Sequence, residues 1–132
     1  MSQTKITMTL LQNAEDFLRE AVYHAKEATP RNWKYAILHL CSALELLLKA
    51  ILEQEHWSLI FENVNEASRP KLYSGNFRSV RFDTAVERLQ GILGSPLTPK
   101  DVKFLKTLRD RRNCLMHFAA NLNINETMSL VA

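Results

Sequence analysis

The chain has 132 residues, of which 46% are hydrophobic and 23% are charged, with only three Gly and four Pro. This size and composition fit one globular domain over residues 1–132 and exclude a two-domain chain. So few turn-forming residues argue against a β-sandwich or a disordered tail, and long helices are therefore expected.

The net charge of +3 is unevenly distributed along the chain. Residues 1–66 carry six Lys or Arg and nine Asp or Glu, whereas residues 67–132 carry eleven and five. A basic second half suits a surface that binds a polyanion, and a solvated helix face explains the charge equally well.

The sequence gives no sign of a membrane span, a secretion signal or a metal site. No apolar run approaches the roughly 18 residues that a membrane span needs, so we expect a cytoplasmic protein without membrane association. Cys41 and Cys114 stand alone, without the spacing of a zinc site or a disulfide framework. His24, His39 and His56 show no metal spacing either, so we assign them no role and expect no metal and no cofactor.

The first half of the chain contains two predicted amphipathic helices. Apolar residues recur every three or four positions over residues 6–28 and again over residues 32–55. Pro30 should close the first of these helices. The second has the wider apolar face, so we expect it at the centre of a helical bundle.

The helical rhythm is lost over residues 58–81, where turn-forming residues separate short apolar pieces. We interpret this segment as a long loop with room for a short hairpin, and an insertion of this size usually acts as a lid or binding loop. Its basic residues are Arg69, Lys71, Arg78 and Arg81. Beyond it, Asp83 or Thr84 can cap a third helix over residues 83–93.

A clear helix start follows at Thr98, where Pro99 and Asp101 supply a first-turn proline and an N3 acid. We expect a fourth helix over residues 99–118. Residues 123–131 are candidates for a last short helix.

The segment Leu108 to Phe118, LRDRRNCLMHF, interrupts the apolar face of this fourth helix. At about 100° per residue, Arg111 and Arg112 fall on the two flanks of the face that Leu108 and Leu115 define. Burying an unpaired guanidinium costs several kcal/mol, so we expect this face to meet a cleft or a partner surface.

Arg109, Asn113 and His117 are spaced by four and form a second line on the same helix. A neutral imidazole can act as a base, and an arginine supplies a permanent positive charge for a phosphate. The combination suits proton transfer at a phosphodiester. The plainer explanation is a basic helix face with an ordinary surface histidine.

The element RNCLMH, Arg112 to His117, resembles the RNxxxH signature that HEPN domains carry on the last long helix of an all-α bundle. The second predicted helix, AILHLCSALELLLKAIL from Ala36 to Leu52, is similar to the HEPN helix at the bundle centre. The resemblance extends from about Leu10 to Phe118. It implies an all-α, HEPN-like bundle of four to five helices, in which the basic insertion over residues 58–81 is not part of the common pattern.

The resemblance also implies a homodimer in which the two signature helices face each other and line a composite cleft. Leu108 and Leu115 would then pack on their symmetry mates while Arg112 turns toward the cleft. The implied catalytic residues are Arg112, Asn113 and His117. Substrate binding is assigned to Arg109, Arg111 and Glu45, of which Glu45 matches an acidic position on the central helix. Arg111 also fits the family's spacing, so which arginine acts is open.

Many HEPN domains are metal-independent endoribonucleases of toxin–antitoxin and other antiviral defence systems. By resemblance, His117 would take a proton from a ribose 2′-hydroxyl, which attacks the adjacent phosphorus, while Arg112 and Asn113 steady the phosphate. The alternative is a non-catalytic dimeric module that binds a nucleotide, a nucleic acid or a partner protein. A third hypothesis is the inhibitory or sensor part of a two-protein defence pair, with a nucleotidyltransferase as partner.

Overall fold

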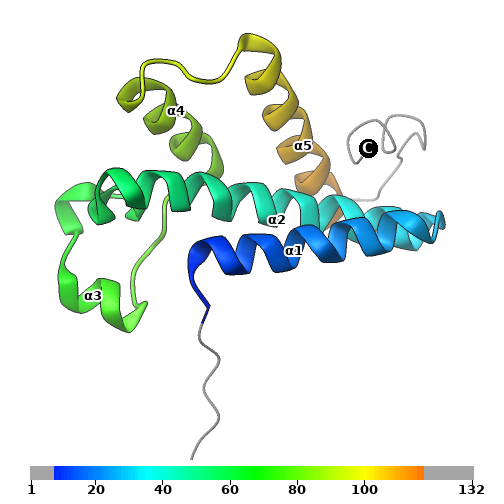
Figure 1. The fold of residues 1–132 in the computed structure, drawn as a ribbon, viewed down its shortest axis with the longest axis horizontal. Helices are drawn as coiled ribbons and strands as arrows, with labels where there is room; N and C mark the ends of the chain where they lie inside the picture. Colours follow the sequence, from blue (N-terminus) through cyan, green and yellow to red (C-terminus); the bar gives the residue numbers. More distant parts are fainter. Residues whose placement is uncertain (1–7, 118–132) are drawn as a thin grey trace, which may run out of the picture.

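The computed structural model describes residues 8–117. Within that range the chain forms five α-helices and two short 3-10 helices and contains no β-strand (Figure 1). The prediction of an all-α bundle is therefore confirmed. The candidate helix over residues 123–131 lies outside the described residues.

The first two helices form an antiparallel pair, α1 (Leu10–Lys26) and α2 (Pro30–Glu55). Helix α1 begins at Leu10 because the Thr9 hydroxyl accepts a hydrogen bond from the Gln12 amide and the Gln12 side chain accepts one from the Thr9 amide. This reciprocal cap satisfies two donors that the first turn leaves unpaired. It places the start four residues after the predicted one.

The prediction that Pro30 closes the first helix is wrong, because Pro30 is the first residue of α2. A proline is well suited to this position, where the amide hydrogen that it lacks would have no partner. The chain reverses at Ala28, which has a φ of 51°, and Thr29 then caps α2 through its hydroxyl.

Helix α2 is the central element of the described structure, as its wide apolar face predicts. It contacts α1 on one side, and α4 (Phe82–Ile92) and α5 (Pro99–His117) stand against the opposite side (Figure 1). Most of the buried residues form one cluster drawn from these four helices and Val80. Its fully buried members include Ile37, Cys41, Leu52, Val80 and Leu108.

By length and composition alone, α2 could cross a membrane, since it is long enough and has an apolar stretch with a mean hydropathy of 1.7. The expectation that no segment approaches a membrane span is therefore too strict. In the described structure, this apolar surface packs on α1, α4 and α5. A central helix of a bundle needs the same composition, since it has neighbours on several sides.

The insertion between α2 and α4 has more structure than the predicted loop. It contains two 3-10 turns, Trp57–Ile60 and Val64–Glu66, a short helix α3 (Arg69–Ser74) and a single antiparallel bridge between Phe61 and Ser79. This bridge is the single β-type pairing within the insertion, so the short hairpin that the sequence allowed does not form.

The insertion is also fastened to the core. Ile60, Phe61 and Val80 are buried, and Phe61 stacks on Phe77 with ring centroids 4.1 Å apart. The Arg88 guanidinium of α4 donates to the carbonyl oxygens of Leu59, Phe61 and Glu62, over 2.5–2.7 Å. The segment is thus an integral part of the bundle surface rather than a free flap.

Helices α4 and α5 differ in how they begin. The predicted cap of α4 at Asp83 or Thr84 is wrong, because the helix starts at Phe82 after Arg81, whose side chain makes no capping bond. The predicted start of α5 is confirmed: the Asp101 amide donates to the Thr98 hydroxyl over 3.1 Å, and the Thr98 amide donates to the Asp101 carboxylate over 3.0 Å.

Candidate functional site

Helix α5 carries most of the residues that the sequence assigns to a site, and Arg112 is the one that faces α2. Its Nη1 lies 3.2 Å from Oε2 of Glu45, and its Nη2 donates to the side-chain oxygen of Asn113 over 3.3 Å. The Arg112 and Glu45 side chains are 29% and 23% exposed. Three of the predicted site residues therefore meet at one half-buried junction of α2 and α5.

The ion pair between Arg112 and Glu45 explains how an arginine is accommodated beside the apolar face of α5. A second copy of the chain was expected to accommodate Arg112, but Glu45 of the same chain already neutralises its charge. The expected contact of Leu108 with its symmetry mate is also wrong, because Leu108 is fully buried in the core and Leu115 packs against that core. The dimer is therefore not needed to explain these residues.

Glu45 links Arg112 to a second cation on its own helix. Nζ of Lys49 lies 3.6 Å from Oε1 of Glu45 and donates to the Ser79 hydroxyl over 3.0 Å. Lys49 is only 9% exposed, so its charge is held away from water and depends on this partner. The network Arg112–Glu45–Lys49–Ser79 thus joins α5, α2 and the insertion.

Burial beside this network affects Cys41. Burial raises the pKa of the Cys41 thiol to about 11, and the positive charges of Arg112 and Arg109 offset part of that rise. Cys41 is therefore a protonated thiol at neutral pH and has the character of a small core residue.

Arg109 faces α4 rather than α2. It forms an ion pair with Asp83 of α4 and donates to Oδ1 of Asp110 over 2.9 Å, and these hydrogen bonds, that to Asp83 first, raise the pKa of Arg109. With Asp83, Phe82, Val86 and Lys106 it lines a cavity of about 530 Å³ between α4 and α5. Arg109 thus belongs to a different part of the surface from Arg112.

The two remaining predicted residues, Arg111 and His117, lie on α5 on either side of the segment that carries Arg112. Arg111 is half-buried, and His117 is exposed at the last described residue of α5. Five residues of helix separate Arg112 from His117 by about 7.5 Å along the axis and about 140° around it. Within one copy, the predicted base and the predicted phosphate-binding arginine therefore point in different directions.

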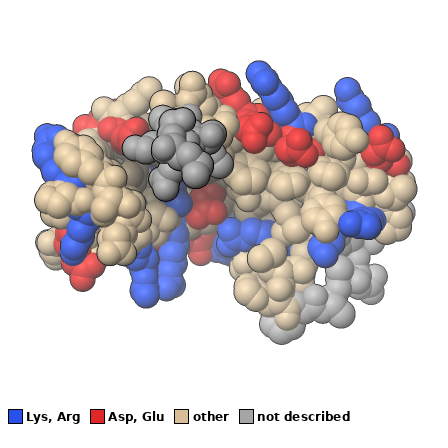
Figure 2. All heavy atoms as spheres, turned by 90° about the horizontal axis from the view of Figure 1, so that it is seen from below, with Lys and Arg blue, Asp and Glu red and all other residues tan. Residues whose placement is uncertain are grey.

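The basic residues of the insertion are all on the surface. Arg69, Lys71, Arg78 and Arg81 are exposed, while the buried apolar residues of the same segment are Ile60, Phe61 and Val80. Figure 2 shows Lys and Arg side chains gathered at the end of the molecule where α3 lies. Acidic side chains also appear at this end, and over the rest of the described part of this face acidic and basic side chains are mixed.

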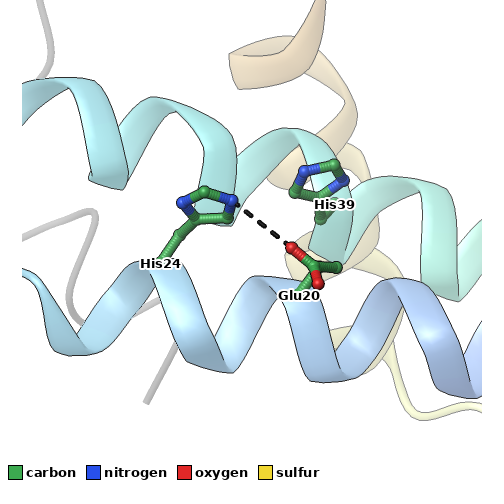
Figure 3. A group of neighbouring side chains, drawn as sticks. All are labelled: Glu20, His24 and His39. Carbon is green, nitrogen blue, oxygen red and sulfur yellow. Dashed lines mark ion pairs between the residues drawn. The ribbon is translucent and has the colours of Figure 1, made fainter.

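A second cluster, which the sequence reasoning missed, lies between α1 and α2. Glu20 and His24 of α1 meet His39 of α2, with one possible ligand atom of each within 4.8 Å of the others (Figure 3). Nε2 of His24 is 3.6 Å from Oε2 of Glu20, and the His24 ring stacks on that of His39 with centroids 5.4 Å apart. Glu20 is exposed and the two histidines are half-buried.

One part of this cluster could have been found in the sequence. Glu20 and His24 are four residues apart, a spacing that places two ligand atoms on one face of a helix. His39 lies fifteen residues beyond His24, and only the antiparallel pairing of α1 and α2 brings it close. Burial, and after it the neighbouring His24, lowers the pKa of His39, which favours its neutral form.

Comparison with protein-family models, with curated proteins and with solved structures returned no match. The fold and the side-chain geometry are therefore what a functional assignment has to rest on.

Proposed function

We propose that the chain is a HEPN-like domain that acts as a metal-independent endoribonuclease in a bacterial defence or toxin-type system. The observation that carries the proposal is the junction of Arg112, Asn113 and Glu45. Arg112, which begins the RNxxxH element and bonds to Asn113, lies 3.2 Å from the acid of the central helix that the same resemblance singles out. These residues are 67 positions apart in the chain, so the contact supports a common site rather than a chance motif.

In the proposed reaction, His117 removes the proton from a ribose 2′-hydroxyl, and the resulting oxygen attacks the adjacent phosphorus. The bond to the 5′-oxygen of the next nucleotide breaks and this oxygen takes up a proton from solvent, which leaves a 2′,3′-cyclic phosphate and a 5′-hydroxyl end. Arg112 and Asn113 stabilise the negative charge on the phosphate oxygens. Because the nucleophile belongs to the substrate, DNA should resist cleavage.

The proposed site requires two copies of the chain. Arg112 and His117 point in different directions on one α5, so an arginine of one copy and a histidine of the other would have to face the same phosphate. A homodimer through α5, with its exposed face around Cys114 and His117, gives that arrangement. The exposed basic side chains of the insertion would add phosphate contacts that do not depend on sequence.

The test is RNA cleavage in EDTA with the wild-type chain, His117→Ala and His56→Ala. His56 is exposed and lies at the far end of α2, so it serves as the matched control. The proposal expects cleavage by the wild type and by His56→Ala, with 2′,3′-cyclic phosphate products and no cleavage at a 2′-deoxy position, and loss of cleavage in His117→Ala. Equal cleavage by all three proteins, or none by any, contradicts it.

A second candidate function is a dimeric binding module without catalysis, which the engaged state of Arg112 favours. Its guanidinium already bonds to Glu45 and Asn113, so part of its hydrogen-bonding capacity is taken up within the chain. Such a module would bind a nucleotide, a nucleic acid or a partner protein such as a nucleotidyltransferase. It predicts RNA affinity that falls steeply with salt and is unchanged in His117→Ala, with no product formed.

A further inference from the structure

We propose that Glu20, His24 and His39 form a binding site for a divalent transition-metal ion, with Zn²⁺ as the ion that suits it best. Two imidazoles and one carboxylate are a ligand set that zinc uses at sites with an open fourth position. The site is separate from the proposed ribonuclease residues, and the inference does not depend on the proposed function.

The spacing of the three side chains is close to that of a bound ion. Zinc bonds of about 2.0–2.1 Å in a tetrahedron place neighbouring ligand atoms about 3.3 Å apart. Nε2 of His24 and Oε2 of Glu20 are already 3.6 Å apart, and the three ligand atoms lie within 4.8 Å of one another. Glu20 is 52% exposed, so its side chain can move the remaining distance without displacing core residues.

The orientation of His24 is fixed in the way that metal-binding histidines usually are. The side-chain amide of Asn32 donates to the Thr29 hydroxyl over 2.8 Å, which identifies the opposite atom of that amide as its oxygen. This oxygen lies 2.8 Å from Nδ1 of His24 and therefore accepts a hydrogen bond from it. A histidine that binds a metal through one ring nitrogen commonly donates the hydrogen of its other ring nitrogen to an oxygen of this kind.

The same hydrogen bond places the proton of a neutral His24 on Nδ1 and leaves the lone pair of Nε2 able to bind a cation. With the proton on Nδ1, a neutral His24 directs the lone pair of Nε2 toward the Glu20 carboxylate (Figure 3). Two acceptors that face each other at this distance repel unless a cation lies between them. Either a proton or a metal ion fills that role, and the second imidazole beside them, His39, favours the metal.

The surroundings favour a cation and leave room for water. The Glu20 carboxylate supplies one negative charge at the site itself, which attracts a cation. His24 is 20% exposed and Glu20 faces solvent, so an ion could enter and keep a water as its fourth ligand. The ion would cross-link the last two turns of α1 to the third turn of α2, near the reversal that joins the two helices.

The test is calorimetric titration of the chelator-treated full chain with ZnCl₂ at pH 7.5. The ligand variants are Glu20→Gln, His24→Gln and His39→Gln, and the matched controls are His56→Gln and Cys114→Ser, which alter other zinc-binding side chains. We expect one saturable site in the wild type and in both controls, and an affinity at least tenfold lower in each ligand variant. Glu20→Gln changes an exposed side chain, so far-ultraviolet circular dichroism should show an unchanged helix content.

Two further measurements separate this site from any other. Asn32→Ala should weaken zinc binding by about 10–100-fold, and Asn32→Asp, which keeps an acceptor for His24, should restore it. Co²⁺ used as a spectroscopic probe should show the absorption of a nitrogen–oxygen site without a thiolate charge-transfer band. The absence of saturable Zn²⁺ binding to the wild type, unchanged affinity in all three ligand variants, or a thiolate band would each overturn the proposal.

Discussion

Helices α2 and α5 are the two longest described helices, and they are held in place by different forces. Helix α2 buries nine residues, mostly apolar, against neighbours on several sides, whereas α5 buries only Leu105 and Leu108. Besides this smaller apolar contact, α5 is joined to its neighbours by two ion pairs, Arg109 with Asp83 and Arg112 with Glu45, and its first turn is capped by Thr98. The helix that carries the predicted chemistry is thus the more easily displaced of the two.

The largest expected difference between the two helices is in thiol reactivity, because each carries one cysteine. Burial raises the pKa of Cys41 on α2 from 9.0 to about 11, which reduces its thiolate at pH 8 about a hundredfold, whereas Cys114 on α5 is exposed. Iodoacetamide at pH 8 should therefore label Cys114 first and Cys41 at least a hundred times more slowly. Mass spectrometry of the labelled peptides, with a urea-unfolded sample as control, measures the ratio; equal rates would show that α5 does not cover α2.

The next effect concerns the ion pair that fastens α5 to α2. Glu45→Gln leaves the charges of Arg112 and Lys49 without their carboxylate, and we expect it to lower the free energy of unfolding by about 1.5–3 kcal/mol. Urea denaturation measures this loss, and Glu53→Gln, an exposed acid on the same helix, is the matched control with an expected change below about 0.5 kcal/mol. Glu45→Gln should also speed the labelling of Cys41. A loss no larger than that of the control would mean that apolar packing alone positions α5.

The smallest effect is expected at the start of α5. Thr98→Ala removes the hydroxyl that caps the helix and should cost about 1 kcal/mol at neutral pH, while Thr98→Ser should retain most of the stability. Hydrogen bonds from Thr98, the backbone one first, lower the pKa of Asp101 below 3.8, so the stability that its carboxylate adds is present at neutral pH and is lost as the pH falls through that lowered pKa. Nuclear magnetic resonance titration of the Asp101 carboxyl should give a higher pKa in Thr98→Ala. An unchanged pKa would contradict the capping role.

The sequence predicts the helices because their determinants are local. The apolar rhythm of α2 and the Thr98–Asp101 cap of α5 each lie within a few turns, and both agree with the structure. The start of α4 was missed because Arg81 makes no side-chain cap that a pattern could reveal. The insertion over residues 58–81 was predicted, but its internal order was not, because bonds from Arg88, more than twenty residues away, hold its backbone.

The candidate sites show the same difference between residues that are close in the sequence and contacts that depend on the fold. The Arg112 element is contiguous and could be recognised in the sequence, but its pairing with Glu45 depends on how α5 crosses α2. The sequence did not reveal that Glu45 pairs with Arg112 within one copy, because a helical wheel places residues on one helix and carries no information about the facing one. Glu20 and His24 share a helix face, whereas His39 joins them only through the antiparallel packing of α1 and α2.

The hydrogen bonds from Arg88 to the insertion affect which sequence changes the insertion can accept during evolution. Arg88 donates only to main-chain oxygens, which every amino acid supplies. These bonds therefore do not depend on the side chains at Leu59, Phe61 and Glu62. Exposed positions of the segment could diverge freely among relatives while the loop keeps its course, provided that this one arginine is inherited. Its replacement would leave these three carbonyl oxygens without their donor and weaken the segment beside the bridge between Phe61 and Ser79, although buried Phe61 and Val80 would still anchor it.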